Sequence, residues 1–137
     1  PSYGYNLRGA ISQIDTNSLG LGGRYSDLDY SKRTPIPPIT DSEIASPSGM
    51  YALGDGFMGD DKIIVGQDFA LWRTKNIQGY WGSTILAQAR HRGHANIVFC
   101  DGHVESPTLK FLFTDTSDEA LSMWNRDHLP HREKLSP

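Results

Sequence analysis

The sequence predicts an α+β fold in which a small antiparallel sheet with long irregular loops is followed by a C-terminal helix. The first observation is an Asp101-Gly102 pair between two short apolar runs, which is a strong hairpin signal. The second is a capped, amphipathic stretch near the C-terminus. The third is composition, since 14 Gly, 8 Pro and only 37% apolar residues indicate a loop-rich chain with a small core. At this length we expect residues 1–137 to form one domain.

The N-terminal part of the chain is expected to contain little regular structure. Residues 1–17 are predicted to form a short ordered segment, and Gly and Pro become frequent over residues 18–49. Thr34–Ile39 should be extended and unpaired, because proline fixes φ and lacks a backbone donor. Asp41–Ala45 could form one helical turn.

Three short apolar segments are predicted to be strands besides those of the hairpin. Met50–Leu53 resembles a buried strand that ends at a Gly-Asp-Gly sequence. Ile63–Val65 consists of β-branched residues, which favour strands. Leu109–Phe113 alternates as a strand does.

The hairpin is predicted over residues 95–106, with a type I′ turn at Asp101-Gly102. Three pairs then face each other: Cys100 and His103, Phe99 and Val104, and Val98 and Glu105. In this register Ile97, Phe99 and Val104 share the face that we expect to be buried. Cys100 and His103 lie together on the opposite face.

The C-terminal helix is predicted over Ser117–Asn125. Thr116 is the expected N-cap, and Glu119 stands three residues later, at the spacing of a capping box. The apolar stripe of the helix includes Trp124, which we expect to pack inward, and Pro130 marks the end of the segment.

Charge and cysteine content exclude some classes of protein. The formal net charge is −3, without a clustered basic face, which argues against a nucleic-acid partner. The single cysteine, Cys100, excludes an internal disulfide framework.

A histidine-rich group at the hairpin is a candidate zinc site. Its possible ligands are His91, His94, Cys100 and His103. The alternative is that the cysteine is a small buried residue and the histidines make structural hydrogen bonds. No spacing here matches a standard zinc finger.

An acidic group in mid-chain is a candidate calcium site. Its possible ligands are Asp55, Asp60 and Asp61, with backbone carbonyls of the surrounding Gly-rich loop. The alternative is an acidic loop that is simply solvated, since no EF-hand spacing is present.

The residues of the hairpin also carry a family resemblance. His91, nine residues and then Asp101-Gly102 resembles the H-x(9)-D-G signature of bacterial prepilin-like proteins, which are similar to type II secretion pseudopilins. Three further motifs of the chain agree with this resemblance and extend it over nearly the whole length: Tyr3–Asn6, Met50–Asp55 and Trp124–His131.

The resemblance implies a function, partners and a location. It implies a pilin-like globular head of a pseudopilin or type IV-pilin-like subunit, without catalytic activity, that assembles with other pilin-like subunits and the secretion machinery. It implies a periplasmic or extracellular location and an inner-membrane anchor in the N-terminal hydrophobic helix. Such a helix needs about 18 or more apolar residues, and residues 1–137 contain no such run, so we expect a C-terminal fragment. Known calcium binding by major pseudopilins favours the acidic group as a metal site.

Two alternatives to the filament subunit remain open. One is a secreted carbohydrate- or partner-binding module that uses aromatic side chains: Tyr25, Tyr30, Trp72, Tyr80 and Trp81. The other is a metal-dependent hydrolase built on the His and Asp residues. For the signature residues His91, Asp101, Gly102 and His103, we expect a structural role. Their side chains should tie loops to the hairpin, with His91 reaching either the turn or the loop that carries Asp55.

Overall fold

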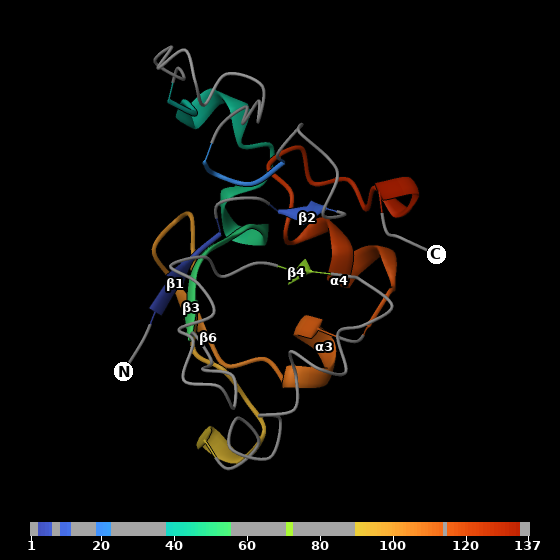
Figure 1. Cartoon of the computed structure of the whole chain (residues 1–137). Coiled ribbons are helices and arrows are strands. Elements are labelled where there is room, and N and C mark those ends of the chain that lie inside the picture. The colour runs from blue at the N-terminus through green and yellow to red at the C-terminus, as the bar shows by residue number, and fades with distance from the viewer. Residues whose placement is uncertain are drawn as a thin grey trace, which may run out of the picture.

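The computed structural model describes seven stretches of the chain, which together hold the sheet and the helices (Figure 1). These stretches are residues 3–6, 9–11, 19–22, 38–55, 71–72, 90–113 and 115–134. The expected strand at Ile63–Val65 and most of the extended segment Thr34–Ile39 lie outside them. The helical turn expected at Asp41–Ala45 is present as the 3-10 helix η2 (Asp41–Glu43).

A four-stranded antiparallel sheet is the main element of the fold. Its spatial order is β1 (Tyr3–Tyr5), β3 (Tyr51–Asp55), β5 (Ile97–Phe99) and β6 (Val104–Glu105). A second, two-stranded parallel pair joins β2 (Ala10–Ile11) to β4 (Leu71–Trp72). The small antiparallel sheet with short helices confirms the α+β prediction.

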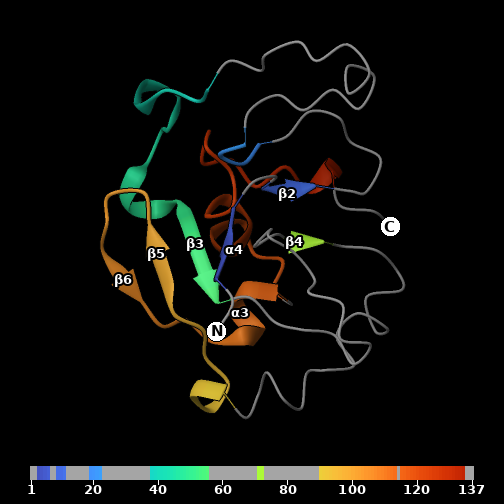
Figure 2. The same cartoon turned by 60° about the vertical axis from the view of Figure 1, so that its left-hand side comes forward.

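Short helices cover one face of the sheet (Figure 2). They are α3 (Leu109–Phe113) and α4 (Asp118–Ser122). Three further 3-10 helices are η3 (Pro47–Gly49), η4 (Arg90–Arg92) and η5 (Arg132–Lys134). Among the described residues, no helix combines the length and the apolar character that are needed to cross a membrane.

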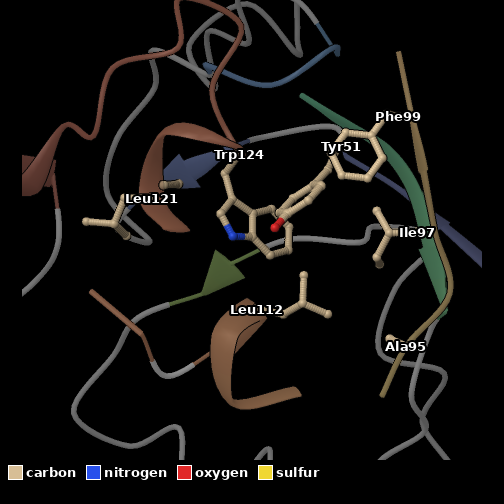
Figure 3. Close-up of a cluster of buried hydrophobic side chains, with 8 residues drawn as sticks. Tyr51, Ala95, Ile97, Phe99, Leu112, Leu121 and Trp124 are labelled. Atoms are coloured by element: carbon tan, nitrogen blue, oxygen red, sulfur yellow. The ribbon is translucent and has the colours of Figure 1, made fainter. Parts of the chain in front are cut away.

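The core lies between α4 and the inner face of the sheet, with Trp124 at its centre (Figure 3). Trp124 and Tyr51 are fully buried, and their rings meet edge to face with centroids 5.2 Å apart. Tyr51 also meets Phe99 edge to face at 5.3 Å. Such pairs add to the stability gained from burial alone. The predicted inward packing of Trp124 is therefore confirmed.

A register shift in β3 places Tyr51 and Leu53, which stand two residues apart, on opposite faces of the sheet. Tyr51 pairs with Phe99 and Leu53 pairs with Val98, so β3 has one more residue than β5 between these pairs. The extra residue bends the strand and re-aims the side chains around it. As a result Tyr51 is buried in the core while Leu53 is 39% exposed on the outer face.

The hairpin is present, but its turn and register differ from the prediction. Gly102 N–H donates to the Phe99 carbonyl, and Phe99 N–H donates to the His103 carbonyl. Gly102 has a φ of 91°, whereas Asp101 does not have a positive φ. This is a three-residue loop, a type I turn followed by a left-handed glycine, and not a two-residue type I′ turn.

The longer loop shifts the pairing of the hairpin by one residue. Val98 lies opposite Val104, and Ile97 lies opposite Glu105. Ile97 and Phe99 are buried as predicted. Val104 was expected in the core, but it is 61% exposed, because a shift of one residue moves a side chain to the other face.

Two predictions near the C-terminus are wrong in detail. Leu109–Phe113 is a helix instead of a strand. Thr108 favours the helix, since its hydroxyl accepts from Phe111 N–H at 3.1 Å and its carbonyl accepts from Leu112 N–H. Helix α4 starts one residue later than expected, because the side chain of Ser117, not Thr116, accepts from Ala120 N–H at 3.3 Å. It also ends at Ser122 and not at Asn125.

Replacing Gly102 by valine should destabilise the fold through the backbone alone. No atom lies within 4 Å of a Cβ added at Gly102, so steric contact contributes nothing. A left-handed conformation costs a β-branched residue about 1–2 kcal/mol, and we expect that loss in chemical denaturation of Gly102→Val. Gly102→Asn is the matched control and should lose less, because asparagine tolerates positive φ. Equal stability of Gly102→Val and the wild type would contradict this turn geometry.

Candidate functional site

A left-handed turn leads the chain into β5. His91, Arg92 and Gly93 have φ values of 47°, 55° and 84°, and His94 N–H donates to the His91 carbonyl at 3.2 Å. Left-handed backbone costs a non-glycine residue about 1 kcal/mol or more, so flanking contacts must hold this turn. They are made by Leu109 N–H, which donates to the Gly93 carbonyl, and by the bridge between His94 and Thr108.

Asp55 anchors this turn to the end of β3. Its Oδ2 atom accepts from Asn96 N–H at 2.7 Å and lies 3.4 Å from Nε2 of His91. Asp55 N–H donates in return to the Asn96 carbonyl. The Asp55 carboxylate is almost buried, whereas the His91 imidazole is 47% exposed. The hydrogen bonds between Asp55 and Asn96 therefore stabilise this connection more than the contact with His91 does. Of the two positions expected for His91, the structure shows the one beside Asp55.

His103 bonds and stacks within the hairpin, on Asp101, Glu105 and Phe99. Its Nδ1 atom is 2.5 Å from Oδ1 of Asp101, and its backbone N–H donates to the same oxygen at 3.1 Å. These hydrogen bonds, with the side-chain one the larger effect, lower the pKa of Asp101. The imidazole also stacks on Phe99, with centroids 4.1 Å apart. His103 therefore stiffens the turn and covers a core residue.

The proposed zinc ligands do not come together. His91, His94, Cys100 and His103 all lie in the described part of the chain, where no three His, Cys, Asp or Glu side chains form a group that could hold a metal. The Cys100 thiol is half-buried, and burial, followed by the charge of Asp101, raises its pKa, which disfavours the thiolate that zinc requires.

The calcium hypothesis involves only one described residue. Asp55 already uses Oδ2 to accept from Asn96, and it is 7% exposed. Asp60 and Asp61 lie outside the described residues. Most of the aromatic residues of the carbohydrate-binding alternative lie outside them as well, and for Trp72 only the backbone is placed, in β4.

A buried asparagine joins three segments that are distant in the sequence. The side-chain amide of Asn6 donates to the Tyr51 carbonyl at 2.8 Å and to the Trp124 carbonyl at 2.9 Å. Its side-chain oxygen accepts from Gly9 N–H at 3.0 Å. Asn6 is completely buried, so it satisfies backbone groups that water cannot reach.

A second buried asparagine, Asn125, completes this arrangement at the end of α4. Its oxygen accepts from Ala10 N–H at 2.9 Å, and its amide donates to the Leu129 carbonyl at 2.7 Å. Gly9 is required here, since a Cβ at this position would lie 2.8 Å from Oδ1 of Asn125 and 2.8 Å from Gly20 N. Arg126 adds a bond from Nη1 to the Gly20 carbonyl at 3.0 Å.

Sequence reasoning did not identify this asparagine network. Asn6 and Asn125 belong to the motifs Tyr3–Asn6 and Trp124–His131, but neither residue was assigned a role. The available signal was an asparagine directly after a short strand and another directly after a buried tryptophan. Long-range partners of a side-chain amide, however, depend on how distant segments pack.

His131 forms a third polar group, near the C-terminus. Its Nε2 is 2.6 Å from Oδ2 of Asp127, and its Nδ1 is 2.9 Å from Oε1 of Glu133. With carboxylates at both ring nitrogens, only the imidazolium form can donate both hydrogen bonds. The bonds join the segment after α4 to η5. The ring of His128 lies against Gly49.

Comparison of the chain with protein-family models, curated proteins and solved structures finds no match in any of the three.

Changing Asn6 to aspartate should destabilise the protein strongly. A carboxylate cannot donate to the carbonyls of Tyr51 and Trp124, so the substitution buries a charge facing two acceptors. We expect a loss of about 3 kcal/mol or more at neutral pH, and a smaller loss in acid, where the new carboxyl is protonated. Urea denaturation at both pH values measures this. Ser48→Asp adds the same charge at an exposed position and should change stability little.

His131 should make stability depend on pH. Burial of the imidazole, the largest single effect, lowers its pKa, but hydrogen bonds to Glu133 and Asp127 and their charges outweigh it, so the pKa is raised. The stabilisation is therefore complete below the unfolded value of about 6.5 and is lost as pH rises through the folded pKa.

The measurement is the free energy of unfolding of wild type and His131→Gln. The difference between the two should be larger at about pH 5.5 than at about pH 8.5. Arg132→Gln removes an exposed ion pair of a permanently charged side chain with Asp118, and its effect should be equal at both pH values. A His131→Gln effect that grows with pH would show that the neutral imidazole is the stabilising form.

Proposed function

We propose that this protein is a non-catalytic structural subunit, the globular head of a pseudopilin-like or type IV-pilin-like filament protein in secretion or surface assembly. In this proposal the full-length protein is anchored in the inner membrane by an N-terminal hydrophobic helix. The head then lies in the periplasm or outside the cell, where it contacts other pilin-like subunits.

The observation that supports the proposal most is the meeting of the family-like motifs in space. Asn6, from the first motif, donates to carbonyls of Tyr51 and Trp124, which belong to the second and third. Asp55, also in the second motif, contacts His91, the first residue of the H-x(9)-D-G signature. Motifs that resemble a family one by one thus form a single set of contacts, as expected if they were selected together to maintain one head domain.

The contacts and backbone conformations of the signature residues agree with a structural role. His91 lies beside Asp55, and Gly102 provides the left-handed turn position. Asp101 accepts from the backbone and side chain of His103, which stacks on Phe99. These contacts fix the backbone around the hairpin, and a filament subunit needs such rigidity for repeated contacts with its neighbours.

The outer face of the sheet provides an apolar surface for such contacts. The register places Tyr5, Leu53, Val98 and Val104 in one row across the four strands. Tyr5, Leu53 and Val104 are 40%, 39% and 61% exposed. Exposed apolar side chains that adjoin each other are typical of interaction sites.

A test of the proposal needs the full-length protein in its native cells. Antibodies raised against residues 1–137 should label filaments sheared from the cell surface. Loss of the prepilin peptidase should increase the mass of the protein and abolish the label. Cells in which the protein stays in the soluble fraction, with an unchanged mass, would contradict the proposal.

A matched pair of variants tests the role of the sheet face in the same cells. Leu53→Asp should reduce incorporation into filaments, with little loss of stability because Leu53 is partly exposed. Lys110→Asp, an exposed change on α3, should be incorporated normally.

A secreted carbohydrate-binding module is the second candidate, favoured by two exposed tyrosines. Tyr3 and Tyr5 are 66% and 40% exposed and stand two residues apart on β1, so they share one side of the strand. Their rings could stack on adjacent sugar units. Binding on a glycan array that is lost in Tyr3→Ala would favour this candidate.

A further inference from the structure

Strand β6 forms an edge of the sheet, and among the described residues no strand pairs with its outer side (Figure 2). In an antiparallel pair, residues alternate between those bonded to the neighbour and those that point away from it. Phe99 N–H donates to the His103 carbonyl, so His103 is bonded toward β5. The next residue, Val104, therefore directs its N–H and C=O toward the open edge.

The side chains at this edge are complementary to those of a second copy. If two β6 strands pair in antiparallel orientation about Val104, the two Val104 residues exchange both backbone hydrogen bonds. The same register brings His103 of each copy opposite Glu105 of the other, and so sets an imidazole donor against a carboxylate. Glu105 is 59% exposed, and its Oε1 is already 3.5 Å from Nε2 of its own His103, so it can reach an imidazole across the pair.

The apolar row on the outer face would continue across the same junction. It runs through Tyr5, Leu53 and Val98 and ends at Val104. Val104 is more exposed than Tyr5 or Leu53. Pairing at β6 places the Val104 side chains of the two copies side by side and covers part of each. The backbone, the polar residues and the apolar row thus all match the same register.

We propose that the protein self-associates through β6 as a closed twofold dimer, which joins two four-stranded sheets into one of eight strands. The interface uses the same surface on both copies, so it closes and does not propagate. Because the edge is short, the dimer is a transient one that depends on concentration. This inference does not depend on the proposed filament function.

Sedimentation of the purified 137-residue chain over a range of concentrations tests the proposal. We expect a monomer–dimer equilibrium without larger species. Val104→Pro should raise the dissociation constant by about tenfold or more, because each dimer loses two N–H donors. Proline is tolerated at an edge strand where the N–H faces outward, and circular dichroism checks that the variant is folded.

Two comparisons distinguish edge pairing from other contacts. Leu53→Lys alters the sheet face away from the edge, and it should leave the dimer in place. A dimer lost in Leu53→Lys but retained in Val104→Pro would overturn the proposal in favour of face-to-face packing. A chain that stays monomeric at all concentrations, or that forms open-ended oligomers, would also overturn it.

Cross-linking tests the register without relying on Val104→Pro. In a Cys100→Ser background, His103→Cys protein is mixed with Glu105→Cys protein and oxidised. Residues opposite each other at a non-hydrogen-bonded position lie about 4.5 Å apart between Cα atoms, within the range for a disulfide. We expect the mixed disulfide to form faster than either homodimer disulfide. Equal rates for all three would contradict the register.

Discussion

Two buried side-chain amides satisfy backbone groups of the residues that form the hydrophobic core, and the packing of the fold depends on them. Asn6 and Asn125 each supply donors and an acceptor to backbone groups of other segments, and both are fully buried. Strands β1 and β2 are too short to satisfy these groups by sheet pairing. Without the amides, buried carbonyls and N–H groups would lose their partners, at a cost of about 1–3 kcal/mol each. The packing of Trp124 against the sheet therefore depends on polar contacts around it.

The sequence predicts the features of this chain that depend on neighbouring residues. The Asp101-Gly102 pair correctly marks the hairpin, and the apolar stripe correctly identifies Trp124 as a core residue. It predicts less well where two local patterns compete. Leu109–Phe113 fits both a strand and one helical turn, and the Thr108 cap decides for the helix. Similarly, an Asp-Gly pair is compatible with a two- or a three-residue loop, and the difference of one residue exposes Val104.

Features that depend on distant residues could not be predicted. The position of His91 beside Asp55 was one of two expected arrangements, and the choice depends on the pairing of β3 with β5. The histidines and the cysteine of the supposed zinc site are close in sequence. His91 and His94 nevertheless lie before β5, Cys100 lies in the hairpin loop, and His103 lies after that loop, so among the described residues they form no group that could hold a metal. Spacing alone does not contain that information.

The contact between Asn6 and Trp124 spans 118 residues and has a consequence for how the chain folds. Contacts between the two ends of a chain must overcome the loss of entropy of the whole intervening loop. During synthesis, Asn6 emerges from the ribosome long before Trp124, so the core is complete only after the segment that carries Trp124 has been released. In the interval β3 lacks its partner β5, and the apolar side chains that pack on Trp124 stay exposed, as in the partly folded species that are prone to aggregate.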